Sequence, residues 1–176
     1  MHNYIFILLI LFMSCATNPI DQHDDNVILQ SLIKIADLGK IMSYDLDSSR
    51  TVDCMELPDT ICVWQDGRIT QLNLYNMGLS GPIPENVGEL DKLVTLGLRT
   101  NELTGGIPES IGNLSELTQL SLDSNRLSGN IPESIGNIKK LNWLRLVNNQ
   151  FSGSIPDTIG SLPALRGLLI NGNQFN

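Results

Sequence analysis

Five side chains between positions 75 and 145 have the chemistry of a recognition site. They are two aromatic residues, two arginines and one aspartate: Tyr75, Arg99, Asp123, Trp143 and Arg145. Trp, Tyr and Arg supply much of the binding energy at interfaces, because they combine a large contact area with hydrogen-bond donors. Tyr75, Arg99 and Asp123 are spaced by 24 residues, which predicts equivalent places in neighbouring units.

Residues that could support catalysis form no recognisable pattern. Ser80, Ser128 and Ser152 recur beside glycines, but the chain has 2 His, His2 and His23, and neither occupies a related position. An activated serine needs a neighbouring base. The sequence also lacks a glycine-rich phosphate loop and a cluster of metal ligands. We therefore expect no enzymatic activity, no cofactor and no metal.

Acidic residues recur once per unit and dominate the net charge. Glu85, Glu109, Glu133 and Asp157 form a column that predicts a solvated acidic face, with a calcium ladder as the less favoured alternative. The formal net charge of the chain is -8. Binding to nucleic acid needs a basic surface that neutralises phosphates. The charge therefore disfavours nucleic acids and anionic membrane faces as partners.

A period of 24 residues without insertions organises the chain from position 69 onward. Apolar residues recur at three places in each unit: Ile69, Leu93, Leu117, Leu141, Leu165; Leu72, Leu96, Leu120, Leu144, Leu168; and Leu74, Leu98, Leu122, Leu146, Ile170. An asparagine follows in four units, at Asn101, Asn125, Asn149 and Asn173, with Met77 in the first. The second half of the unit repeats a glycine and an Ile-Pro pair. Such a period predicts stacked units with one shared core.

The repeated pattern L-x-x-L-x-L-x-x-N-x-L followed by S/T-G-x-I-P-x-x-I-G-x-L resembles plant-type leucine-rich repeats. These occur in plant receptor-like proteins, polygalacturonase inhibitors and some bacterial surface proteins. The resemblance covers residues 61–176 and implies an α/β repeat solenoid, a short right-handed arc with a parallel concave sheet behind a helical, disulfide-bonded N-terminal cap. The predicted units are 69–92, 93–116, 117–140, 141–164 and the partial unit 165–176.

Each repeated residue type has a structural role. The two leucines of L-x-L alternate with outward residues and face inward from a short strand. The asparagine is expected to bond backbone groups where the chain leaves the strand. The glycine supplies a conformation that other residues resist, and Ile-Pro keeps the return segment extended.

Residues 27–68 are predicted to form the cap. Apolar residues at helical spacing indicate an amphipathic helix over about 25–42. Asp66-Gly67 predicts a hairpin turn into the first repeat strand. Cys54 and Cys62 predict a disulfide in an exported chain, with a metal site as the alternative. The segment is similar to the plant cap but places Trp64 after the second cysteine instead of between the two.

The first 16 residues are predicted to be a signal peptide, because the apolar run from Tyr4 to Met13 is too short to span a bilayer. A cut before Thr17 implies secretion, whereas a lipobox-like cut before Cys15 implies a lipid anchor on that cysteine. Residues 17–26 are expected to be a flexible tether. Asn113-Leu114-Ser115 is a glycosylation sequon if the source is eukaryotic.

The last unit stops at Asn176, inside the pattern. We favour an incomplete gene product. The alternative is an uncapped end that docks a partner, including another copy of the chain.

The outward strand positions are the surface that the repeat leaves free to vary. They include all five residues named above, and Trp143 is the strongest candidate; its alternative is ordinary packing on Gln119 or Arg145. Arg99 and Asp123 are expected to form a plain surface ion pair. Five strands expose roughly 400–500 Å², below the about 800 Å² per partner of a standard interface. This predicts weak or peptide-sized binding.

The favoured function is therefore a non-enzymatic extracellular module, secreted or anchored at the cell surface, that recognises a protein or peptide through its concave strand face. The alternatives are an inhibitor of a secreted enzyme and a structural surface protein, ice binding included. The last alternative draws on a column of small polar residues, Asn76, Thr100, Ser124 and Asn148.

Overall fold

The computed structural model describes residues 62–65 and 68–176. The predicted signal peptide, tether and cap helix lie outside these residues, and so do Cys15, Cys54 and the turn at Asp66-Gly67. Cys62 is buried, with 4% of its surface exposed. The disulfide between Cys54 and Cys62 therefore stays a prediction.

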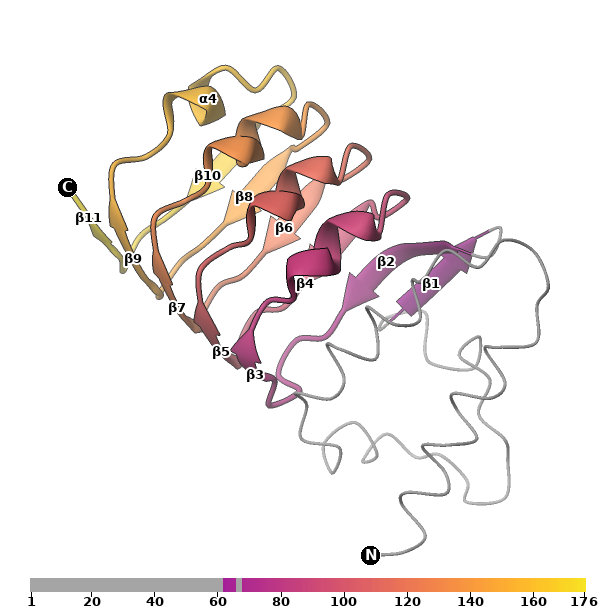
Figure 1. Cartoon of the computed structure of the whole chain (residues 1–176), viewed down its shortest axis with the longest axis horizontal. Coiled ribbons are helices and arrows are strands. Elements are labelled where there is room, and N and C mark those ends of the chain that lie inside the picture. The colour runs from indigo at the N-terminus through magenta and orange to yellow at the C-terminus, as the bar shows by residue number, and fades with distance from the viewer. Residues whose placement is uncertain (1–61, 66–67) are drawn as a thin grey trace, which may run out of the picture.

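One sheet of six strands runs from β1 to β10 through the part of the chain that the structure describes (Figure 1). Its strands are β1 (Cys62–Gln65), β2 (Arg68–Asn73), β4 (Thr95–Gly97), β6 (Gln119–Ser121), β8 (Trp143–Arg145) and β10 (Gly167–Leu169). β1 pairs antiparallel with β2, as the hairpin prediction required. The other pairs are parallel and join residues 24 positions apart, such as Leu96 with Leu120. The sequence period is thus the register of this sheet.

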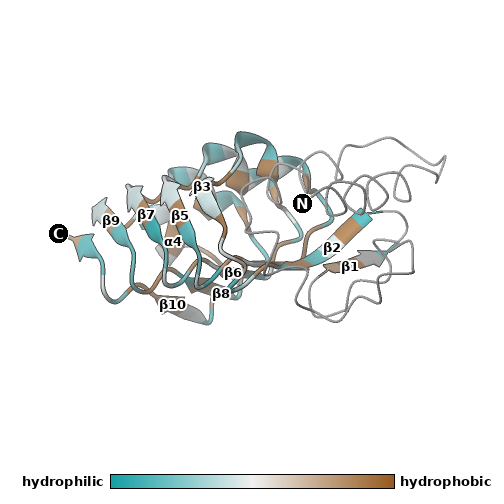
Figure 2. Cartoon of the chain, turned by 90° about the horizontal axis from the view of Figure 1, so that it is seen from below, coloured by the Kyte–Doolittle hydropathy of each residue, from teal (hydrophilic) through white to brown (hydrophobic). Residues whose placement is uncertain are grey.

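A second parallel sheet of five strands was not predicted. It contains β3 (Ser80–Pro82), β5 (Glu102–Gly105), β7 (Arg126–Gly129), β9 (Gln150–Gly153) and β11 (Gln174–Phe175). Figure 2 shows these strands on another side of the stack from β6, β8 and β10. The extended return segment predicted from the Gly and Ile-Pro pattern supplies the strands. A period-24 pattern alone does not tell that neighbouring return segments also pair.

Short helices occupy the third side of each coil: η3 (Glu85–Glu89), η4 (Glu109–Asn113), η5 (Glu133–Asn137) and α4 (Asp157–Gly160). A proline precedes each one, and its fixed φ and missing N–H suit the start of a helix. The glycine within η4 permits close stacking, because a Cβ on Gly112 would lie 2.5 Å from the Ser134 carbonyl oxygen of the next coil. The acidic residues of the predicted column begin these helices and are exposed.

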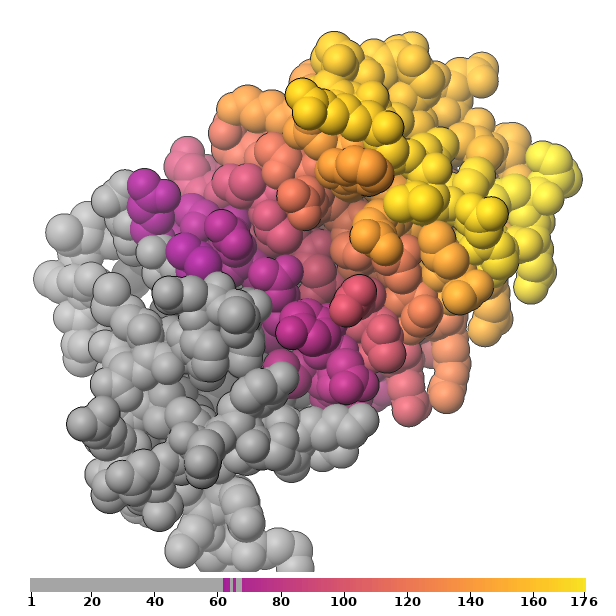
Figure 3. Space-filling view, turned by 180° about the vertical axis from the view of Figure 1, so that it is seen from behind, coloured from indigo at the N-terminus to yellow at the C-terminus, as the bar shows by residue number. Residues whose placement is uncertain are grey.

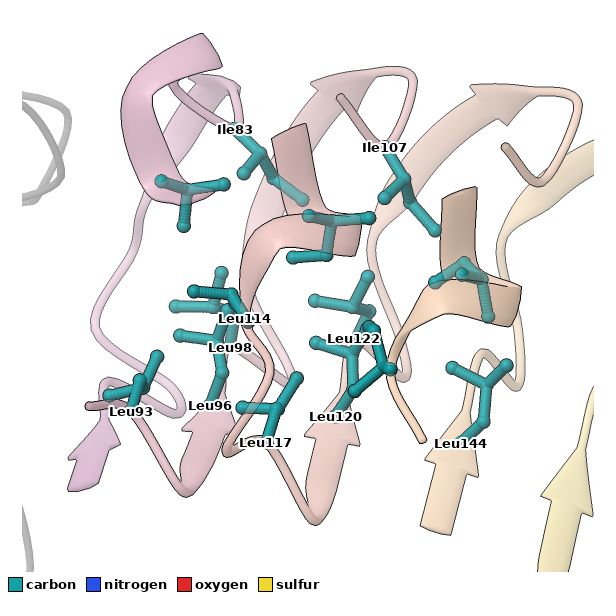
Figure 4. Packing of buried hydrophobic residues seen from close by; sticks show 14 of the residues in the cluster. Ile83, Leu93, Leu96, Leu98, Ile107, Leu114, Leu117, Leu120, Leu122 and Leu144 are labelled. Atoms are coloured by element: carbon teal, nitrogen blue, oxygen red, sulfur yellow. The ribbon is translucent and has the colours of Figure 1, made fainter. Parts of the chain in front are cut away.

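The predicted aliphatic core is confirmed. Leu96, Leu120 and Leu144 are fully buried and lie at the same place on successive coils (Figure 4). The last coil is less covered: Leu165, Leu168, Ile170 and Phe175 are partly buried against the core. Phe175 stacks on Phe151 with ring centroids 6.4 Å apart. Apolar burial at roughly 25 cal/mol per Å² makes this shared interior the main stabilising term.

The regular spacing of the asparagines produces a ladder of hydrogen bonds between coils. Asn101 Oδ1 accepts hydrogen bonds from the backbone N–H groups of Met77 and Leu79, both at 3.0 Å. Its Nδ2 donates to the carbonyl oxygens of Leu74 and Leu98, both at 2.8 Å. Each asparagine therefore satisfies its own turn and that of the preceding coil. The sequence predicted bonds within the asparagine's own turn only. The bonds to the preceding coil were not predicted.

A column of residues in the left-handed region precedes Met77 and the asparagines of the next three units. Asn76, Thr100, Ser124 and Asn148 have φ between 55 and 57°. Asparagine tolerates this region, whereas a β-branched threonine rarely adopts it. The stacked backbone bonds hold Thr100 there, since its N–H donates to the Asp123 carbonyl oxygen at 2.8 Å.

Candidate binding face

We use the name strand face for the outward side chains of β2, β4, β6, β8 and β10. It also includes the residue two positions after the end of each of these strands. It contains Gln71, Asn73, Tyr75, Thr95, Gly97, Arg99, Gln119, Ser121, Asp123, Trp143, Arg145, Val147, Gly167, Leu169 and Asn171. Figure 3 looks onto the side of the stack away from the helices, where the repeats adjoin one another from magenta to yellow.

Trp143 lies on this face beside a glycine of the next strand. Its side chain is 43% exposed. A Cβ at position 167 would lie 2.2 Å from both Cε3 and Cζ3 of the indole, so the ring occupies the space that any other residue would fill. β8 and β10 pair Trp143 directly with Gly167, and this register creates the contact. The indole thus packs over Gly167, a neighbour that the alternative of packing on Gln119 or Arg145 did not include.

An open hollow of about 250 Å³ lies on the other side of the indole. It is lined by Gln119, Leu120, Ser121, Trp143 and Arg145, from the adjacent strands β6 and β8. Ser121 and Arg145 are paired across these strands, as are Gln119 and Trp143. The hollow therefore offers an aromatic surface, an amide, a hydroxyl and a guanidinium within the reach of one bound side chain.

Asp123 fixes the position of Arg145. Arg145 Nε donates to Asp123 Oδ2 at 3.0 Å, and the Ser121 hydroxyl donates to the same oxygen at 3.2 Å. Asp123 Oδ1 accepts the backbone N–H of Val147 at 2.9 Å. Asp123 is only 7% exposed, so little of its surface is open to a partner. Its geometry is that of a residue that positions a guanidinium.

The ion pair expected between Arg99 and Asp123 is not formed. Arg99 lies over the ring of Tyr75, with Cζ 5.3 Å from the centroid, in a cation–π arrangement. The prediction was wrong because it relied on the one-period spacing between Arg99 and Asp123, whereas Arg145 of the next unit, 22 residues after Asp123, also lies beside that carboxylate. The bond from the Val147 N–H orients the carboxylate toward the repeat that carries Arg145.

The five predicted residues thus form two groups. Trp143 and Arg145 line the hollow, with Asp123 bound to Arg145, and Tyr75 with Arg99 forms a second aromatic–arginine pair. Three strand spacings of about 4.8 Å and four residues of about 3.3 Å separate Tyr75 from Trp143, which gives a diagonal of roughly 20 Å. An extended segment of about six residues spans that length.

Sequence reasoning named Gln119 only as an alternative packing partner of Trp143, and it did not single out Gly167 or Ser121. The signal was present in the columns of outward residues, where a glycine beside a tryptophan marks a space that the ring can fill. Asn113 of the glycosylation sequon is exposed at the end of η4, so the site is accessible.

Within residues 62–65 and 68–176, no helix is both long and apolar enough to cross a membrane. Within the same ranges, no group of three or more His, Cys, Asp or Glu side chains is placed to hold a metal ion.

The family model of a leucine-rich repeat region matches residues 67–175. Among solved structures, the BIR3–SERK2 complex from Arabidopsis thaliana is similar with a TM-score of 0.73 and 34% identity, over 87% of this chain and 84% of that one. The plant peptide hormone receptor RGFR1 in complex with RGF2 has a TM-score of 0.59 and 40% identity, over 60% and 17%. A plant ice-binding protein has a TM-score of 0.72 and 30% identity, over 86% and 49%.

Some of these relatives are much longer than the present chain. It spans 18% of a TDR receptor chain, at 44% identity and a TM-score of 0.57. The similarity to such receptors therefore concerns a few repeats of a longer arc.

Proposed function

Because this chain belongs to the leucine-rich-repeat proteins, we propose that it is a non-enzymatic extracellular module that binds a protein or peptide segment through its strand face. The observation that carries the proposal is Trp143, which is 43% exposed and yet held against Gly167 beside a hollow. An exposed indole held in one position loses little conformational entropy on binding.

The geometry supports a small ligand segment. A hollow of about 250 Å³ accommodates one large side chain. The strand face is smaller than a standard protein interface, so the affinity should be modest unless several copies act together. The relative RGFR1 is described as a peptide hormone receptor in complex with RGF2, which is consistent with this use of the fold.

We assign the predicted residues different roles within this proposal. Trp143 and Arg145 contact the bound segment at the hollow, and Tyr75 with Arg99 contacts it at the far end. Asp123 positions Arg145. Secretion or a lipid anchor on Cys15 would present the strand face outside the cell, and Asn113, on η4, leaves that face open if it is glycosylated.

Peptide display on the immobilised full chain tests the proposal. Peptides selected by the wild-type chain should bind Trp143→Ala at least tenfold more weakly. The matched control is Gln150→Ala, an exposed residue of β9 in the same repeat but in the other sheet. Equal binding by wild type and Trp143→Ala, or failure to select any peptide, contradicts the proposal.

A second candidate function rests on the column of Asn76, Thr100, Ser124 and Asn148. These side chains are exposed and share nearly one φ, so they repeat regularly along the stack. The plant ice-binding protein shares the fold. Thermal hysteresis of the purified chain tests this candidate, and freezing behaviour equal to that of an albumin control contradicts it.

A further inference from the structure

Charges are segregated between the sides of the coil. The side formed by the short helices carries five carboxylates, Glu85, Glu89, Glu109, Glu133 and Asp157. The segments 83–90, 107–114, 131–138 and 155–162 contain no lysine or arginine. A peptide with negative charge is therefore repelled from this side of the molecule.

The opposite balance holds where the chain enters the long sheet. Five cations lie at these entries: Arg68 begins β2, Lys92 lies before β4, Lys139 and Lys140 lie before β8, and Arg166 precedes β10. Two carboxylates lie at the same entries, Asp91 before β4 and Glu116 before β6. We call these residues the strand-entry rim. The strand face beside it carries Arg99 and Arg145 against Asp123. Rim and strand face together are thus cationic in a chain with a net charge of -8.

Both carboxylates near Trp143 are already paired. Glu116 on the rim contacts Lys140, and Asp123 contacts Arg145. Within the described residues, Arg145 contacts Asp123 through Nε alone, so the two terminal nitrogens of its guanidinium stay available to a ligand. The Arg145 side chain is 47% exposed, against 11% for Asp123. The local charge that a bound segment meets at the hollow is therefore positive.

The apolar and cationic features are adjacent. Lys139 and Lys140 precede Trp143 by four and three residues, and Arg166 immediately precedes Gly167, on which the indole lies. An occupant of the hollow thus has Arg145 within the hollow itself and Arg166 on the rim side, with Lys140 beside Glu116 and Lys139 Nζ donating to the Gly136 carbonyl oxygen of η5. A charged terminal nitrogen of Arg145 can hydrogen-bond a carboxylate, and charge-assisted bonds of this kind are the stronger ones.

We propose that the partner segment is an acidic extended peptide in which one aromatic or aliphatic side chain enters the hollow between Trp143 and Arg145, flanked by Asp or Glu residues that meet Arg145 and the strand-entry rim. This inference rests on the proposed function and specifies the chemistry of the ligand. Carboxylates recognised in this way also steer the segment away from the helical side.

Three labelled nine-residue peptides test the inference by fluorescence polarisation with the full chain. Each has a central phenylalanine, flanked on both sides by glutamate, glutamine or lysine. We expect the glutamate peptide to bind at least tenfold more tightly than the glutamine peptide. Its affinity should fall several-fold between 50 and 300 mM salt, since exposed charges are screened over about a Debye length.

Variants separate the site from general attraction. Arg145→Gln and Lys140→Gln should each weaken the glutamate peptide several-fold, and Trp143→Ala should weaken it tenfold or more. Arg126→Gln, which removes a cation from β7 of the other sheet, should leave it unchanged. Equal losses in Arg126→Gln and Arg145→Gln would overturn the assignment.

The two proposals can fail separately. If display selects neutral or basic peptides whose binding depends on Trp143, the strand face binds peptides but the acidic preference is wrong. Tighter binding of the glutamine or lysine peptide overturns the preference in the same way. If no peptide depends on Trp143, the proposed function itself fails.

Discussion

The indole of Trp143 occupies the space above Gly167 that a side chain would take, and the parallel register of β8 and β10 puts the two residues opposite each other. A glycine in one repeat thus decides where the tryptophan of the preceding repeat lies. The packing of the indole on Gly167 therefore affects the proposed binding site, because the same indole forms one wall of the hollow.

Replacing Gly167 by alanine should displace the ring of Trp143. The φ of Gly167 lies outside the left-handed region, so the backbone accepts alanine, and the 2.2 Å contact is the only obstacle. We expect a shift in tryptophan emission and a several-fold loss of peptide affinity, with little change in the free energy of unfolding. Trp143→Phe identifies the part of the emission that belongs to this residue. An unchanged spectrum and unchanged affinity would show that the ring does not depend on Gly167.

Truncation of the central core leucine should be costly. Leu120 is fully buried between coils that cover it on both sides, so Leu120→Ala should destabilise the chain by about 2–5 kcal/mol. Leu168→Ala, at the same position of the last coil, should cost less because Leu168 is only partly buried. Urea denaturation followed by circular dichroism measures both. Equal midpoints for the two variants would contradict a shared interior that is deepest at its centre.

The asparagine ladder should respond to loss of a single amide. Asn125 accepts the N–H of Leu103 at 3.0 Å and donates to the carbonyl oxygens of Leu98 and Leu122, both at 3.0 Å. Asn125→Ala leaves the buried Leu103 N–H without this partner, at about 1–3 kcal/mol for an unsatisfied group. The carbonyl oxygens of Leu98 and Leu122 keep one amide donor each, from Asn101 and Asn149. The exposed Ser124→Ala is the neighbouring control and should stay within about 0.5 kcal/mol. Similar denaturation midpoints for the two variants would show that the asparagine ladder does not stabilise the fold.

Thr100 offers a stabilising substitution. Its φ of 57° is unfavourable for a β-branched residue, whereas Asn76 and Asn148 adopt the same conformation with a residue that tolerates it. Thr100→Asn should therefore raise the free energy of unfolding by about 0.5–1 kcal/mol. Thr104→Asn, on the exposed side of β5, is the control and should bring no gain. A lower midpoint for Thr100→Asn would show that the threonine is held without strain.

The long sheet and the core were predictable from the sequence because one spacing repeats without a break. Leu96, Leu120 and Leu144 had to share a face once the units stacked. The second sheet was not predictable in this way, since the sequence pattern of Gly and Ile-Pro requires an extended segment but not hydrogen bonds between neighbouring segments. The short helices were missed because five residues do not establish a helical period.

The sequence predicted which residues lie on the candidate surface, but it did not predict which of them contact one another. Column positions identified Trp143 and Arg145 as outward residues, and both are exposed. The same columns left two partners for Asp123: Arg99, one period before it, and Arg145 in the next unit, 22 residues after it. Only the bond from the Val147 N–H and the approach of Arg145 Nε decided between them.

The most direct test of the central claim is a map of the bound surface by NMR, with a display-selected peptide titrated into the full isotope-labelled chain. We expect the largest shifts at Gln119, Ser121, Trp143 and Arg145, with Glu109 and Glu133 on the helical side unchanged. Shifts concentrated on the helices or on β7 and β9, with an unperturbed Trp143 indole, would contradict that claim.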